Sequence, residues 1–147
     1  MSKLALTNAV VTFQALDSTL SPSGPIYDFS DNIRNIVLST VIAEQDVTEV
    51  GQGYKRVIAG LGTNSVALEF YQDFATNSVE DIIYDWIGTR IQVTIKPVNA
   101  PTSTTNPAYQ FTALVGEWQP LNAGVGQIAT VNVTWPISGP ITKLTTP

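Results

Sequence analysis

The stretch IRNIVLSTVIAEQDVTEVGQGYKRVIAGLGTNSVALEFY, residues 33–71, holds two β-patterned segments joined by a long glycine-rich connection. Residues 33–44 predict a long strand with apolar residues on both faces, and residues 65–71 predict a second strand that alternates. The connection, residues 44–64, carries four glycines but also apolar side chains at Val47, Val50, Tyr54, Val57, Ile58 and Leu61. Connections of this length are usually functional or disordered, and this one is too apolar for a solvated linker. We therefore expect an assembly arm, flexible at its glycines, that needs a partner such as another copy of the chain.

Beyond this stretch, one helix and three further strands are expected. Residues 77–87 predict a helix, with Asn77 or Ser78 as N-cap and an apolar stripe on one side. This helix either docks on the sheet or seals a subunit interface. Alternating patterns predict strands over residues 90–98, 109–118 and 127–135, with a polar loop over residues 99–108.

The two ends of the chain complete the layout. Residues 8–16 predict a strand, residues 17–25 a turn region that prolines and a glycine keep irregular, and residues 26–32 a short extended piece. Residues 136–147 form a C-terminal tail that is poor in charge. Strands and helices do not alternate, so residues 1–147 predict a single α+β, mainly β domain. We expect an antiparallel β-sandwich or barrel of about six or more strands, with one flanking helix and the arm at residues 44–64.

Composition narrows the function classes. Of the 147 residues, 44% are hydrophobic and 13% charged, against about 25% charged in typical soluble domains. An assembly would cover such a surface, although a Ser/Thr/Asn-rich soluble β-domain has a similar composition. The net charge of −5 disfavours a nucleic-acid grip. The chain has no cysteine or histidine, and no long apolar run for a signal peptide or membrane span, so we expect it to fold in a cytoplasm.

Few residues suggest chemistry. Glu69 and Glu117 form the carboxylate pair to test first for glycoside hydrolysis, but the pattern favours two solvated acids on strand faces. Residues 28–31 suggest a small cation site or a capped turn. Three aromatic side chains suit either a ligand groove or core packing: Trp86, Trp118 and Trp135. We expect no catalytic residue, cofactor or metal site. The remaining expectation is self-association, in which strand edges pair between copies and close a ring.

The order of elements resembles that of the major tail tube proteins of long-tailed (siphovirus-type) bacteriophages. The resemblance rests on the strand and arm at residues 33–64, on VALEFYQDFATNSVEDIIYDWIGTRIQVTIKPV at residues 66–98, and on VNVTWPISGPITKLT at residues 131–145. Residues 17–31 have no clear counterpart. The resemblance implies a hexameric ring whose inner sheets join into one barrel, and rings stacked into a tube through which DNA passes.

The resemblance also implies roles for particular residues. The apolar residues of the arm, Val47, Val50, Tyr54, Val57, Ile58 and Leu61, would make ring-to-ring contacts. The acids nearest the expected inner sheet are Glu44, Asp46, Glu69 and Asp73, and an acidic lumen would let DNA slide without specific binding. Expected partners are further copies of the chain and other tail proteins: tape measure, terminator and distal tail. The protein would reside in the virion tail after assembly in the host cytoplasm.

Two other readings stay open. One is another virion β-protein, such as a capsid decoration or tail-completion subunit. The other is a carbohydrate-binding β-sandwich that uses the tryptophans.

Overall fold

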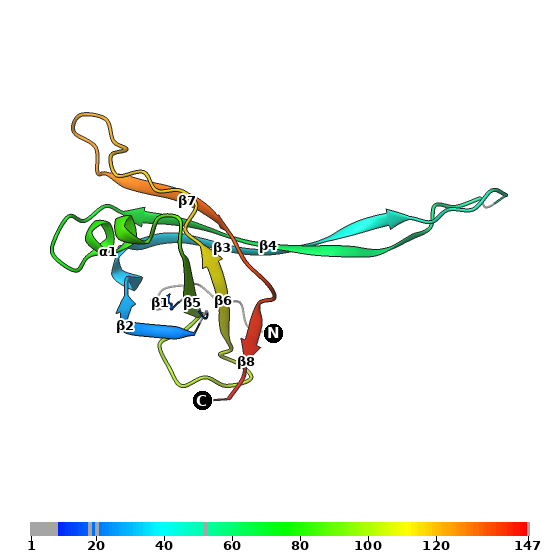
Figure 1. Ribbon diagram of the computed structural model, residues 1–147, viewed down its shortest axis with the longest axis horizontal. Coiled ribbons are helices and arrows are strands. Elements are labelled where there is room, and N and C mark those ends of the chain that lie inside the picture. The colour runs from blue at the N-terminus through cyan, green and yellow to red at the C-terminus, as the bar shows by residue number, and fades with distance from the viewer. Residues whose placement is uncertain (1–8, 18, 20, 52, 147) are drawn as a thin grey trace.

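Two antiparallel sheets form the body of the protein in the computed structural model, which describes residues 9–17, 19, 21–51 and 53–146 (Figure 1). The larger sheet has the strand order β2-β1-β5-β6-β8 and the smaller one β3-β4-β7. The elements are β1 (Val10–Leu16), β2 (Pro22–Asp28), a 3₁₀ turn (Ser30–Asn32), β3 (Ile33–Asp46), β4 (Val57–Tyr71), α1 (Val79–Trp86), β5 (Arg90–Lys96), β6 (Ala108–Leu114), β7 (Thr130–Pro136) and β8 (Thr142–Leu144). This mainly β architecture with one helix is the predicted fold class.

The core lies between the facing sides of the two sheets. Period-two alternation places every second residue of β1, β5, β4 and β7 there, because successive side chains of a strand point to opposite faces. The rings of Phe13 (β1) and Trp135 (β7) meet edge to face at 6.4 Å, and Phe70 (β4) lies 6.2 Å from Trp135. The fully buried side chains of this core include Val11, Phe13, Val66, Leu68, Phe70, Ile91, Val93, Val131 and Trp135.

Helix α1 covers one end of the core. Its side chains Val79 and Ile83 are fully buried, and Ile82 and Trp86 pack partly against the core. Glu80 is half-buried and accepts a hydrogen bond from Trp118 Nε1 at 2.6 Å, which joins the helix to the chain beyond β6. Of the two roles considered for this helix, docking on the sandwich is therefore the one that the structure supports.

The hairpin of β3 and β4 extends far beyond the sandwich (Figure 1). Strand β7 pairs with β4 only from Ser65 to Tyr71, whereas β3 stays paired with β4 as far as Asp46 and Val57. Residues 57–64 of β4 therefore run past the third strand, a projection of about 26 Å at about 3.3 Å per residue.

Several boundaries differ from the sequence predictions. The arm is not an irregular connection, because strands occupy most of residues 44–64 and only residues 47–56 link them. Residues 22–28 form a strand despite Pro22 and Pro25, since β2 is an edge strand and needs no N–H on its outer side. The predicted tail contains β8, and Pro136 closes β7. The predicted first strand began at Asn8, which lies outside the described residues.

Candidate assembly surfaces

The projecting hairpin exposes all six apolar residues that the sequence singled out. Tyr54 and Leu61 keep 88% and 85% of their surface accessible, and Val50 is fully exposed. Val47, Val57 and Ile58 are also exposed, as are Val41 and Ile42 of β3. So many exposed apolar residues on one element usually mark an interaction site. The hairpin therefore offers a surface that its own domain leaves uncovered.

The hairpin tip, defined as residues 47–56, is held by specific bonds. Val47 N donates to Arg56 O at 2.9 Å, and Arg56 N donates to Thr48 Oγ1 at 2.8 Å. Thr48 N donates to Asp46 Oδ1 at 2.9 Å. The backbone and side-chain groups of Thr48 lower the pKa of Asp46 below its ordinary value. Gly51, with φ +93°, supplies a left-handed residue that the turn needs.

The glycines of strand β4 do not act as flexible joints. A Cβ on Gly60 would meet Gln45 Nε2 at 3.0 Å and Ala43 O at 3.1 Å, and one on Gly62 would meet Ile42 Cδ1 at 3.0 Å. The side chains of β3 lie over these two glycines, so the absence of a Cβ permits close packing. The expectation of an arm that flexes at its glycines is wrong at these positions.

The four predicted lumen acids do not gather at one place. Glu44 and Asp46 lie in the far part of β3, and Glu69 lies where all three strands pair. Asp73 follows β4 at the opposite end of the hairpin. The backbone N–H of Ala75 and then the Ser78 side chain lower the pKa of Asp73. Asp73 thus shapes the turn before α1.

The outer face of the three-stranded sheet, which points away from the core, is mostly polar and small. Asn35, Ser65 and Ala67 share this face with Asn132 and Thr134, all opposite the buried residues of the same strands. Its central charges neutralise each other, because the Arg34 guanidinium lies 3.2 Å from Glu69 Oε1. Both side chains are partly exposed, and such pairs contribute little to stability. The face is nearly neutral at its centre.

The outer edge of β7 is covered by its own chain. The even-numbered residues of β7 turn their N–H and C=O groups away from β4. Thr130 N donates to Asn122 O at 3.4 Å, Thr134 N donates to Glu117 Oε1 at 2.6 Å, and Pro136 has no N–H. The segment after β6 therefore protects this edge from pairing with another strand.

The outer edge of β3 is open by contrast. Between residues 35 and 46, the described part of the chain provides no backbone partner on the side away from β4. Exposed edges of this length are templates for pairing with another chain. The sheet β3-β4-β7 is therefore asymmetric, with one protected edge and one open edge.

The candidate carboxylate pair is occupied by structural bonds. Glu69 pairs with Arg34, and Glu117 accepts the N–H of Thr134. Both carboxyl groups thus have structural partners. Glu69 is a strand-face acid as predicted, whereas Glu117 lies in the irregular segment after β6.

The tryptophans belong to the core more than to any groove. Trp135 is fully buried and Trp118 nearly so. Trp86 is partly buried and meets Tyr27 at 5.8 Å between ring centroids. Two of the three rings therefore have no face free to stack on a sugar.

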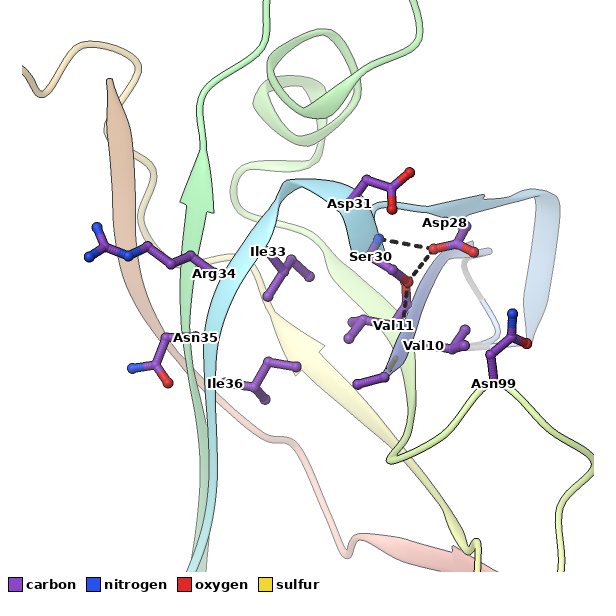
Figure 2. A pocket seen from close by; sticks show the side chains of 11 residues that line it. Val10, Val11, Asp28, Ser30, Asp31, Ile33, Arg34, Asn35, Ile36 and Asn99 are labelled. Atoms are coloured by element: carbon purple, nitrogen blue, oxygen red, sulfur yellow. Dashed lines mark hydrogen bonds between the residues drawn. The ribbon is translucent and has the colours of Figure 1, made fainter. Parts of the chain in front are cut away.

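Residues 28–31 form a capped turn beside an open hollow of about 460 Å³ (Figure 2). Asp28 Oδ1 accepts the N–H of Ser30 at 2.9 Å and also the Ser30 hydroxyl, and Ser30 Oγ accepts the N–H of Val11 at 2.9 Å. Asp31 lies apart from this chain of bonds in Figure 2. The residues that the structure describes contain no cluster of three metal-ligating side chains. Asp28 and Ser30 thus connect the end of β2 to the start of β1.

A second exposed apolar surface, which the sequence did not predict, lies in the loop before β7. The loop before β7 exposes Leu121, Val125 and Ile128, with 83%, 107% and 75% of their surface accessible. This loop and α1 lie toward the end of the molecule opposite the hairpin tip (Figure 1). Apolar residues among glycines were the available signal, the same one that marked residues 44–64. The two ends of the long axis therefore both carry exposed apolar residues.

Within the described ranges, no helix is long and apolar enough to cross a membrane.

Solved structures share this fold. A chain of the tail tube of bacteriophage SPP1 matches 97% of this chain and 80% of its own length, at 14% identity and a TM-score of 0.72. A chain from the sixfold-symmetrised baseplate of the anti-feeding prophage matches 99% of this chain and 98% of its own, at 17% identity and a TM-score of 0.67. A chain from the C6-symmetric tail of an empty gene transfer agent particle matches 90% of this chain and 92% of its own length, at 16% identity and a TM-score of 0.56.

No protein-family model and no curated protein sequence matches this chain. At these sequence identities, the structural matches show the fold alone. The chain has the fold of phage tail tube proteins, which is the resemblance that residues 33–64, 66–98 and 131–145 predicted.

Proposed function

We propose that the chain is a structural subunit of a phage-type tail tube, which assembles into hexameric rings that stack into a conduit for DNA. The observation that carries the proposal is a tail tube fold with a projecting hairpin whose apolar side chains its own domain leaves exposed. Val47, Val50, Tyr54, Val57, Ile58 and Leu61 would make the ring-to-ring contacts. The sixfold symmetry of two structures with this fold supports the hexameric state.

Ring closure would use the open edge of β3. A neighbouring copy would contact this edge through the segment after its own β6, so that the inner sheets follow one another around the ring. The protected edge of β7 favours contact through the segment after β6, which lies outermost on that side. Each copy would then contact one neighbour at its β3 edge and the other neighbour at its β7 side. Such head-to-tail contacts between unlike surfaces are the kind that can close a ring.

The outer face of β3-β4-β7 would line the lumen. Its hydroxyl and amide groups and its internal Arg34–Glu69 pair offer no excess of positive charge to hold phosphates. Of the four candidate acids, Glu69 is the one on this face where the three strands pair, and Glu44, Asp46 and Asp73 would lie nearer the rims. DNA would pass without specific binding, helped by the net charge of −5.

The role would be non-enzymatic, and the protein would reside in the virion tail. Its partners would be further copies of itself and the other tail proteins: the tape measure, the terminator and the distal tail protein. Assembly would take place in the host cytoplasm.

Shortening the hairpin tests the proposal. Replacing residues 43–61 by an Asn-Gly turn joins the paired residues Ile42 and Gly62, keeps every part of β4 that pairs with β7 and removes the projecting arm. The variant is expected to fold and to form single rings or monomers instead of tubes, as seen by negative-stain electron microscopy. Long tubes from this variant would contradict the role of the arm.

A tail-completion subunit is the second candidate, because a baseplate chain shares the fold at a TM-score of 0.67. A completion subunit would form one ring on a partner and would not polymerise alone. Long tubes of the purified chain would exclude it, and single rings that never stack would favour it.

A further inference from the structure

The two ends of the long axis differ in their charged side chains. The hairpin tip holds Lys55 and Arg56, which are two of the seven basic residues and the only adjacent pair in the chain. Helix α1, which lies at the other end of the molecule (Figure 1), carries the exposed acids Asp81 and Asp85. This difference adds to the exposed apolar residues found at both ends.

The basic pair at the tip is weakly engaged within its own chain. Arg56 Nη1 lies 3.9 Å from Glu49 Oε1, and both side chains are more than half exposed. Among the described residues, no carboxylate forms an ion pair with Lys55. The neighbouring Val50 and Tyr54 are almost wholly exposed. The tip thus combines two available cations with two large apolar side chains.

Helix α1 and its C-cap present a complementary surface, formed by the exposed helix residues Asp81, Tyr84 and Asp85 and by the exposed C-cap residue Ile87. Asp85 and Tyr84 follow Asp81 by four and three residues in the helix, so these three side chains are neighbours on its surface. The paired acids repel each other, and Asp85 lies near the C-terminal end, where the dipole disfavours an anion and the last turn has no base. Within the described residues, neither acid has a cationic partner. A cation from another copy would relieve this unfavourable arrangement.

We propose that the hairpin tip of one copy docks on the α1 surface of a copy in the next ring. This inference rests on the proposed tube and names the surface that receives the arm. Lys55 and Arg56 would pair with Asp81 and Asp85, while Val50 and Tyr54 would pack on Tyr84 and Ile87. The contact joins two different surfaces, so it does not close on itself and can repeat along the axis.

Charge reversal at each end tests the pairing. One variant carries Lys55→Glu and Arg56→Glu, and the other carries Asp81→Lys and Asp85→Lys. Each alone should raise the concentration needed for tube formation at least tenfold. The melting temperature of the Lys55/Arg56 variant should stay nearly unchanged, whereas that of the Asp81/Asp85 variant should fall slightly, because Asp81 Oδ2 accepts the N–H of Asn77 at 2.8 Å. Lys143→Glu, which reverses an exposed charge on β8, is the matched control and should assemble as the wild type does.

Mixing the two variants gives the decisive result. The reversed tip of one variant fits the reversed α1 surface of the other, and the unreversed surfaces also fit each other, so an equimolar mixture should form tubes again. The quadruple variant should also form tubes. Two results would show that the pairing is wrong while the tube role stands, provided that the wild-type protein forms tubes. One is that either variant forms tubes at the wild-type concentration. The other is that neither the mixture nor the quadruple variant recovers tube formation. If the wild type forms no tubes, both proposals fail.

Discussion

Replacing Val50, Tyr54 and Leu61 by serine is expected to prevent tube assembly without destabilising the folded chain. Each side chain exposes 85% or more of its surface, so the monomer loses almost no burial. Exposed substitutions of this kind usually change the free energy of unfolding by less than about 0.5 kcal/mol. The cost falls instead on the ring-to-ring contact in which these side chains would be buried.

The size of that cost follows from the exposed side chains. Full burial of one large apolar side chain contributes about 1.5–3 kcal/mol. Three such side chains contribute about 4–9 kcal/mol to each hairpin contact if the interface covers them completely, an upper bound. Even half of the lower value changes the association constant more than tenfold, since about 1.4 kcal/mol corresponds to a factor of ten. The critical concentration for tubes should therefore rise at least tenfold.

A pelleting assay measures this effect. Wild-type and triple-variant protein are centrifuged over a range of concentrations, and the pellets are examined by negative-stain electron microscopy. Ile26→Ser is the matched control, because Ile26 is 64% exposed on the edge strand β2 and lies outside the hairpin. Circular dichroism melts verify that all three proteins fold. The reasoning fails if the triple variant pellets at the wild-type concentration, or if Ile26→Ser impairs assembly equally.

Three further predictions concern the folded chain. Trp135→Ala should lower the free energy of unfolding by about 3–5 kcal/mol, measured by thermal or urea denaturation, because it empties a fully buried site. Glu117→Ala should cost about 1 kcal/mol and speed hydrogen exchange at Thr134 N, whereas Glu117→Gln should retain most protection because it keeps an acceptor. Asp73→Asn should destabilise the protein at neutral pH, since the N–H of Ala75 lowers the pKa of Asp73 in the fold. That stabilisation is complete above the ordinary value of 3.8 and disappears as the pH falls through the lowered pKa, so wild-type and variant stabilities should converge in acid.

Alternation identified the strands that build the core. The apolar faces predicted at residues 65–71, 90–98 and 127–135 are buried in β4, β5 and β7, because a sandwich covers one face of each strand. Helix α1 lies within the predicted residues 77–87. These elements carry strong periodic signals, and packing agrees with local preference in each.

Prolines and glycines led to wrong predictions for other segments. Pro22 and Pro25 predicted irregular chain, yet β2 is an edge strand that tolerates proline. Gly60 and Gly62 predicted flexibility, yet the side chains of Gln45 and Ile42 lie over them in a paired ribbon. A single sequence shows a glycine but not the neighbour that needs the space.

The candidate site was predictable in part. The apolar residues of the hairpin stood out because no domain of this size buries such a segment easily, and all six are exposed. The four acids were grouped as those nearest the expected inner sheet, whereas an extended hairpin separates residues by roughly 3.3 Å each. The exposed apolar residues Leu121, Val125 and Ile128 were not predicted as a surface, because an exposed surface has no periodic pattern to reveal it, and Ile128 fell within the strand predicted over residues 127–135.

Electron microscopy of the purified full-length chain at increasing concentration tests the central claim most directly. The account predicts sixfold rings that stack into tubes, with an open channel along the axis and one hairpin from each copy crossing to the next ring. Monomers or trimers that persist at high concentration, with no rings or tubes at any salt concentration, would contradict it.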